Sequence, residues 1–249
     1  MQLYLTVRPE DTRTASAYPA GLAHAAYRIG EGSSLLSRNL LTPARSGPMA
    51  PLPGLLVLSD RSAPSIDRPA ALAEAVLREC ARRSYGGIVL DFDEPSREDR
   101  RRFAAVLGRR CAESRRSLYL PEAYAAAGEQ RTVLINTAVS GGSLEGYLRG
   151  LLPVWGSRLW VYLAPIRMLF PVPCLSGVGM PLDKAAADAL VARYPPHFSE
   201  DLACCYCFFR DEAGDARVLL FDTEETCRKK LNLLRSLGVR RVFGEIPQT

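Results

Sequence analysis

The chain of 249 residues has few of the residues that build metal centres and catalytic triads. It contains two His (His24 and His197), two Trp, and seven Cys without a recurring spacing. A His-based metal centre or a Ser–His triad therefore has too few ligands or bases. Cys204, Cys205 and Cys207 lie close together, but no second Cys pair completes a four-ligand site, and we interpret them as small apolar strand residues. We expect no metal and no cofactor.

Long apolar runs and nucleotide-binding motifs are also absent. No run is long enough to span a membrane, and the N-terminus lacks the basic region and apolar core of a signal peptide. An odd number of Cys favours reduced thiols, so we expect a cytoplasmic protein, unless a cleaved signal peptide precedes the given sequence. No Gly-x-Ser-x-Gly elbow, P-loop or Gly-x-Gly-x-x-Gly fingerprint occurs.

The net charge of +5 does not by itself indicate a nucleic-acid partner. Many of the Arg residues form short runs such as Arg100–Arg102, which are typical of solvated helix faces. A nucleic-acid-binding protein is expected to gather its basic residues in one patch or stripe. We therefore expect neither nucleic acid nor membrane among the partners.

Apolar segments of strand length alternate with amphipathic helical segments along most of the chain. Strands are expected at residues 3–7, 22–29, 55–60, 86–93, 117–120, 132–137, 158–163 and 239–245. This alternation predicts parallel βαβ units, and eight strands in a chain of this length favour a closed (β/α)8 TIM barrel over a doubly wound open sheet. We expect one domain over residues 1–249, incomplete or irregular around Gly30–Pro53, a segment rich in Gly, Ser and Pro.

One departure from the alternation precedes the last helix and strand. Residues 202–209 and 216–221 are strand-like and flank the turn-forming residues 211–215. This pattern predicts a β-hairpin insertion near 202–221. Asp222 and Glu225 then predict a capping box for the last helix, and Gly238 predicts its end.

Three carboxylates close the segment Tyr85–Pro95. Strand alternation places Asp91 and Asp93 on one face and Glu94 on the other. Two carboxylates buried side by side are costly as anions, so one would keep its proton to a higher pH. The residues leave two interpretations open. Either this is an acid pair at the carboxyl end of a barrel strand, where TIM barrels carry functional groups, or the strand leads into a solvated loop.

Two segments resemble glycoside hydrolase family 18, the family of the chitinases. The sequence Gly-Gly-Ile-Val-Leu-Asp-Phe-Asp at 86–93 resembles the family's fourth-strand signature, Asp-Gly-x-Asp-x-Asp-x-Glu. The hairpin, the acidic turn at 222–226, Lys230-Leu231 and Leu237-Gly238 are similar to the family's closing segment. The resemblance implies a TIM barrel that hydrolyses glycans containing N-acetylglucosamine, such as chitin or peptidoglycan fragments. In that family the acetamide of the substrate is the nucleophile.

The resemblance also implies roles for individual residues at the C-terminal face of the barrel. Asp93 corresponds to the proton-donating Glu, and Asp91 would orient the acetamide and stabilise the positive intermediate. Glu94 would join them only if a bulge turned it inward. The further candidates for substrate contact, chosen by their position at strand ends, are Tyr162, Glu122 and Glu245.

Departures from the signature keep three hypotheses open. Gly86 and Val89 replace the first two acids, Asp93 is one methylene shorter than Glu, and the position of the family's Trp falls near Gly244 and Glu245. The chain is then an active, divergent hydrolase, or an inactive relative that binds a glycan or a partner as a scaffold. The third hypothesis is a phosphate-binding barrel enzyme, with the anion at the helix entry formed by residues 140–143.

Overall fold

The computed structural model describes residues 1–15, 18–38, 52–92, 97–127 and 131–245. The chain divides into two compact units. The first comprises Met1–Ile135, Trp155–Tyr162 and Arg241–Thr249, and the second comprises Asn136–Val154 and Leu163–Arg240. Folding of the whole chain as a single domain stays a prediction.

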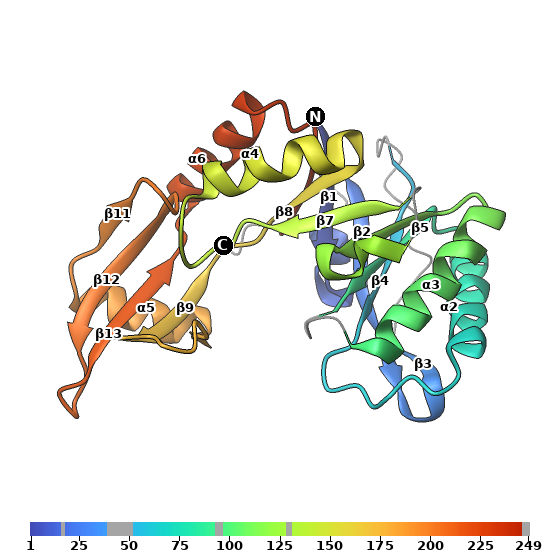
Figure 1. The fold of residues 1–249 in the computed structure, drawn as a ribbon, viewed down its shortest axis with the longest axis horizontal. Coiled ribbons are helices and arrows are strands. Elements are labelled where there is room, and N and C mark those ends of the chain that lie inside the picture. Colours follow the sequence, from blue (N-terminus) through green and yellow to red (C-terminus); the bar gives the residue numbers. More distant parts are fainter. Residues whose placement is uncertain (16–17, 39–51, 93–96, 128–130, 246–249) are drawn as a thin grey trace. The chain divides into compact units, whose positions relative to one another are not determined.

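The first unit contains a closed barrel of eight parallel strands (Figure 1). The strands are β1 (Gln2–Val7), β2 (Gly21–Gly30), β4 (Leu55–Ser59), β5 (Gly87–Asp91), β6 (Ser117–Pro121), β7 (Thr132–Asn136), β8 (Leu159–Leu163) and β14 (Arg241–Glu245). Their hydrogen-bonded order is β1-β14-β8-β7-β6-β5-β4-β2, and β2 pairs with β1 to close the ring. The predicted (β/α)8 barrel is confirmed, and all eight expected strands form.

The segment after β2 is less regular. A 3₁₀ turn (Glu31–Ser33) leads into β3 (Ser34–Ser37), which pairs antiparallel with β2 at the margin of the barrel. The expected irregularity around Gly30–Pro53 therefore begins with a short hairpin. Residues 39–51 of that segment lie outside the described residues.

Helices α2 (Pro69–Arg83) and α3 (Glu98–Glu113) lie side by side next to β4 and β5 (Figure 1). Leu56 and Leu58 of β4 and Ile88 and Leu90 of β5 alternate with the residues that face the barrel interior, and all four are buried. A strand buried on both faces reads as a continuous apolar run, which is why both strands could be found in the sequence. A short helix, α1 (Thr12–Ala15), follows β1.

Aromatic rings fill the barrel interior. Tyr4, Tyr119, Trp160 and Phe243 come from four different strands, and the six ring pairs among them have centroids 5.2–6.3 Å apart. The Tyr4 hydroxyl donates to the Pro53 carbonyl, 3.1 Å away, just before the start of β4. Aromatic pairs in such geometries add roughly 0.5–1.5 kcal/mol each beyond their buried area. The interior of the barrel is therefore a packed core.

Arg100, near the start of α3, corrects the interpretation of the Arg run as a solvated face. Its side chain is 1 % exposed and its Nε lies 3.3 Å from the Asp60 carboxylate, which is equally buried. Its two terminal nitrogens donate to the carbonyls of Pro64 (2.9 Å) and Ala63 (3.2 Å), and one also contacts Asp99. Helical spacing shows which residues of a helix share a face. It does not show that Asp60, which follows β4, lies against Arg100.

The second unit contains a five-stranded antiparallel sheet in the order β10-β9-β13-β12-β11 (Figure 1). The strands are β9 (Arg167–Pro171), β10 (Met180–Pro181), β11 (His197–Ser199), β12 (Cys204–Arg210) and β13 (Ala216–Phe221). The predicted hairpin near 202–221 is β12 and β13, and it belongs to this larger insertion. The helices of this unit are α4 (Leu144–Trp155, whose last residue falls in the first unit), α5 (Lys184–Arg193) and α6 (Glu224–Ser236).

The start of α6 corrects the predicted capping box. Thr223 is the N-cap, and its hydroxyl and that of Thr226 form the reciprocal bonds with the backbone N–H groups. The carboxylate of Asp222 is instead buried, where it binds Lys230 Nζ at 2.6 Å and the Ile166 N–H at 2.9 Å. The side chains of Asp222 and Lys230 are 0 % and 1 % exposed, so the pair joins the end of β13 to α6 inside the unit.

Candidate active site at the barrel mouth

A ring of strand-end residues lies one pleat above the aromatic core of the barrel. Val89, Trp160 and Phe243 point into the core. Because side chains alternate along a strand, the residues two positions later share that inward face at the carboxyl end. These residues are Asp91, Tyr162 and Glu245, three of the six candidates from the sequence.

Tyr162 and Glu245 are hydrogen-bonded to each other at the mouth of the barrel. The Tyr162 hydroxyl donates to Glu245 Oε1 over 2.9 Å. Burial raises the pKa of Tyr162 above its ordinary value of 10, the Glu245 carboxylate raises it further, and the charge of Asp91 acts in the same direction. The phenol therefore stays protonated, and its one proton is donated to a carboxylate.

Asp91 is the last residue of β5, and its side chain is exposed. Its backbone carbonyl accepts from the Asp60 N–H at 3.3 Å, so the ends of β4 and β5 are held together. Next to it, Phe92 turns the other way and is buried against Phe103 and Tyr124. Asp93 and Glu94, the other two acids of this segment, lie outside the described residues.

Glu122 lies in the 3₁₀ segment Glu122–Ala127 that follows β6. Its side chain accepts from the Trp155 indole N–H at 3.2 Å, and the Arg158 guanidinium lies 5.2 Å from the centre of the Trp155 ring. Trp155 was not among the sequence candidates. Only the general enrichment of aromatic residues at sugar sites could have pointed to it, because no motif contains it.

Two polar residues at the mouth were missed in the sequence. Thr6 is paired with Glu245 in the register of β1 and β14, and Ser59 is paired with Asp91 in the register of β4 and β5. The same alternation rule that selected Asp91 places both on the inward face, because Tyr4 and Val57 belong to the core. Thr6 also lowers the pKa of Tyr162 by a hydrogen bond, against the larger effects of burial and Glu245.

Metal and membrane features can be assessed only within the described ranges. There, no group of three or more His, Cys, Asp or Glu side chains has an arrangement that could hold a metal ion. None of the helices in that part of the chain is long and apolar enough to cross a membrane. Cys204 and Cys207 are buried, and Cys205 is partly buried.

Comparisons with known proteins show similarity at the level of structure. No protein-family model and no curated protein sequence matches the chain. A chitinase from Chromobacterium violaceum is 16% identical, with a TM-score of 0.67 and coverage of 98% of this chain and 93% of that one. The spore cortex-lytic enzyme of Bacillus megaterium is 15% identical, with a TM-score of 0.66, and the match covers 98% of this chain and 70% of that enzyme.

A plant protein of the same fold was solved with sugar ligands. The family 18 chitinase from Cycas revoluta, solved with a trimer of N-acetylglucosamine, is 12% identical, with a TM-score of 0.59 and coverage of 98% of this chain and 94% of that one. At such identities the likeness shows the fold. The chain is a divergent barrel of the kind found in glycoside hydrolase family 18, similar in structure to chitinases and spore cortex-lytic enzymes.

Proposed function

We propose that the protein is a glycosidase that cleaves glycans containing N-acetylglucosamine at the carboxyl-terminal mouth of its barrel. The observation that carries the proposal is the exposed Asp91 at the end of β5, on the inward face of a barrel similar to those of chitinases. In TIM-barrel enzymes the catalytic groups stand at this end of the strands.

The chemistry that we propose uses two acids and the substrate's own acetamide. Asp93 gives its proton to the glycosidic oxygen while the acetamide carbonyl attacks the anomeric carbon and the bond to the leaving sugar breaks. Asp91 orients the acetamide and stabilises the positive charge that develops on the resulting ring. Water then opens that ring, and its proton returns to Asp93, which restores the enzyme.

Hydrolysis of defined substrates tests the proposal. Oligomers of N-acetylglucosamine and peptidoglycan fragments are incubated with the protein, and reducing ends are measured. Turnover is expected, and Asp93→Asn and Asp91→Asn should each lower it at least ~10²-fold, because each removes a group that acts in the transition state. Glu98→Gln is the matched control, since Glu98 is an exposed acid on α3 that pairs with Arg102. No turnover on any of these glycans would contradict the proposal.

The second candidate is a glycan-binding barrel without turnover. The observation in its favour is the bond between Tyr162 and Glu245. A phenol that donates its proton to a carboxylate cannot donate it to an acetamide carbonyl, so one expected substrate contact is unavailable in this arrangement. Calorimetric binding of an N-acetylglucosamine oligomer without any release of reducing ends would favour this candidate.

The phosphate-binding hypothesis has less support. Ser143 precedes α4, and its hydroxyl already accepts from the Gly146 N–H at 3.2 Å. The Leu144 N–H donates to the Asp201 carbonyl at 2.8 Å. Two of the N–H groups that would receive an anion are therefore occupied. A shift of the Gly142 and Ser143 amide resonances on adding inorganic phosphate would reverse this preference.

A further inference from the structure

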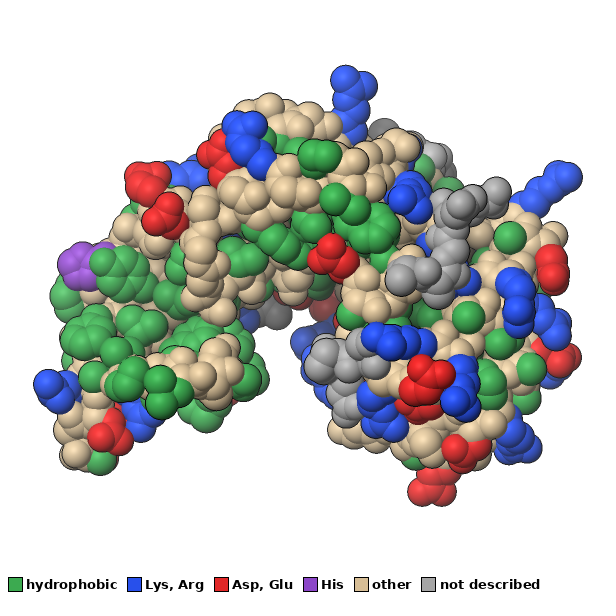
Figure 2. Space-filling model, viewed as in Figure 1, with side chains coloured by type: hydrophobic (Ala, Val, Ile, Leu, Met, Phe, Trp, Pro, Cys, Tyr) green, Lys and Arg blue, Asp and Glu red, His purple; other side chains and the backbone are tan. Residues whose placement is uncertain are grey.

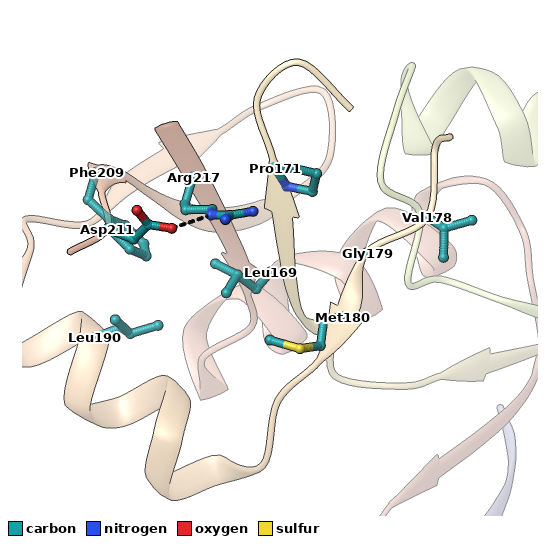
Figure 3. A pocket seen from close by; sticks show the side chains of 9 residues that line it. All are labelled: Leu169, Pro171, Val178, Gly179, Met180, Leu190, Phe209, Asp211 and Arg217. Atoms are coloured by element: carbon teal, nitrogen blue, oxygen red, sulfur yellow. Dashed lines mark hydrogen bonds and ion pairs between the residues drawn. The ribbon is translucent and has the colours of Figure 1, made fainter. Parts of the chain in front are cut away.

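The antiparallel sheet of the second unit carries a pocket that has no part in the proposed hydrolysis. Its volume is about 630 Å³. Small-molecule sites typically occupy ~300–1,000 Å³. Side chains from β9, β10, β12, β13, α5 and the adjoining loops line it (Figure 3). Every lining residue belongs to the second unit, and none is a candidate at the barrel mouth.

The strand register explains how the pocket arises. Arg217 of β13 is opposite Phe209 of β12 on one side and Pro171 of β9 on the other. Two residues along, Leu219 is opposite Cys207 and Leu169, so both rows share one face. Leu219, Cys207 and Phe209 are buried in the cluster that α5 joins through Ala187, whereas Pro171, on the other side of Arg217, is exposed. The sheet face thus extends beyond the cover that α5 provides, and the pocket lies there, next to Leu190 of α5.

The other wall of the pocket is apolar and exposed. Val178, just before β10, and Met180, its first residue, are 71% and 56% exposed. They belong to a run of fifteen residues, 168–182, without a charged side chain. Apolar side chains also gather over this sheet in the space-filling view (Figure 2). Exposed apolar surface of this kind is typical of binding sites.

Arg217 supplies the polar part of the pocket. Its Nε donates to Asp211 Oδ2 at 2.8 Å, and its Nη2 lies 3.4 Å from Asp215 Oδ2. Among the described residues, its Nη1 has no hydrogen-bond partner. Figure 3 shows the guanidinium lying between Asp211 and Pro171. The pocket therefore offers hydrogen-bond donors, but the two carboxylates outweigh the single positive charge of Arg217.

We propose that this pocket binds a neutral amphiphile, a molecule with an apolar body and an uncharged carbonyl or hydroxyl group. The apolar body would cover Leu169, Leu190 and Phe209, and the oxygen would accept a hydrogen bond from Arg217 Nη1. An anionic head group is disfavoured because Asp211 and Asp215 leave this corner with an excess of negative charge. A cationic head group is disfavoured because it meets the N–H groups of Arg217.

A series of three ligands with the same chain tests the proposal. Hexanamide, hexanoate and hexylammonium share an apolar body and differ in the charge of the head group. Each is titrated into the whole protein, and the methyl resonances of Leu169, Leu190, Val178 and Met180 are followed by NMR. Hexanamide is expected to bind about tenfold more tightly than either ion, a ratio that corresponds to one hydrogen bond of ~1.4 kcal/mol.

Two variants separate the roles of the lining residues. Arg217→Met keeps much of the side-chain volume and removes the donor, so the preference for hexanamide should disappear while weak binding of the chain remains. Leu190→Trp fills the pocket from α5 and should abolish binding, with the unshifted resonances of the other unit serving as the check on folding. Leu175→Ser is the matched control, because Leu175 is 95% exposed and does not line the pocket.

Several results would overturn the proposal. Equal affinity for the three ligands, or the same preference in Arg217→Met, overturns the role of Arg217 and with it the proposal. The same holds if Leu175→Ser weakens binding as much as Leu190→Trp does, or if no resonance moves. Resonance changes that follow dilution of the protein instead of ligand concentration would show that a second copy of the chain occupies the pocket, which also overturns the proposal.

Discussion

Removing the Arg100 guanidinium is expected to destabilise the barrel unit strongly. In Arg100→Met the buried Asp60 carboxylate loses its ion pair with Arg100, and the carbonyls of Ala63 and Pro64 each lose a donor. Breaking a buried pair by removing one partner costs roughly 3–5 kcal/mol. Domains are typically stable by only ~5–15 kcal/mol, so this loss is a large fraction of the total.

Urea unfolding measures this effect. Trp160 lies in the barrel core, so the tryptophan fluorescence reports on the barrel. Arg102→Met is the matched control, because Arg102 lies on the same helix and forms an exposed ion pair with Glu98. The Arg102 side chain is 70% exposed and the Glu98 side chain 65%. An exposed pair contributes roughly 0–1 kcal/mol. If Arg100→Met lowers the free energy of unfolding no more than Arg102→Met does, the buried network of Arg100 does not stabilise the barrel unit.

Three further predictions concern titration and reactivity. Glu245→Gln should lower the pKa of Tyr162 in an ultraviolet titration but leave it above 10, because burial is the largest cause of its rise; an unchanged pKa would mean that the two side chains are apart in solution. Burial lowers the pKa of His24 from 6.5 to about 4, so the unfolded state binds more protons between these values. The free energy of unfolding should therefore fall by about 3 kcal/mol as the pH falls from 6.5 to 4, and His24→Leu should remove this part of the loss. Burial raises the pKa of Cys80 and Cys111 to about 12, so an alkylating reagent at pH 8 should modify them in the unfolded protein and spare them in the native one.

The barrel could be predicted because its strands carry their pattern locally. Residues 55–58 and 88–90 are continuous apolar runs bounded by Gly, Ser or Asp, and such runs identify strands buried on both faces. The number of such strand segments, eight, then predicted a closed barrel. Strands β3, β10 and β11 could not be recognised in the same way, because they are only four, two and three residues long. The five-stranded sheet was therefore predicted only as its central hairpin.

The sequence predicts which strand-end residues lie at the mouth of the barrel, but it does not predict which of them form hydrogen bonds with one another. Alternation from Val89, Trp160 and Phe243 leads to Asp91, Tyr162 and Glu245, so a rule with a period of two finds the mouth of the barrel. Which of these side chains form contacts depends on which strands, far apart in sequence, become neighbours in the closed barrel. The bond between Tyr162 and Glu245 spans 83 residues, and no local pattern encodes it.

The same long-range reason explains the corrected interpretations. Arg100 and Asp222 were assigned to a solvated helix face and to a capping box, and both were judged by neighbours within one helical turn. Their principal partners are Asp60, forty residues before Arg100, and Lys230 and Ile166, which lie eight and fifty-six residues from Asp222. A charged residue in an amphipathic helix is ambiguous until the chain that covers it is known.

The aromatic core of the barrel has a consequence for how this protein can change over evolutionary time. Four rings from four strands interlock in the interior. Of the rim residues, Tyr162 packs against this cluster, whereas Asp91 and Glu245 are exposed above it. Substitutions at exposed rim positions such as Asp91 and Glu245 therefore alter the chemistry of the mouth at little cost to stability, whereas substitutions among the four rings lower the stability of the barrel. The residues at the mouth of such a barrel can then change while the frame of strands persists. This separation of tasks accounts for a fold that is recognisable at 16% identity or less.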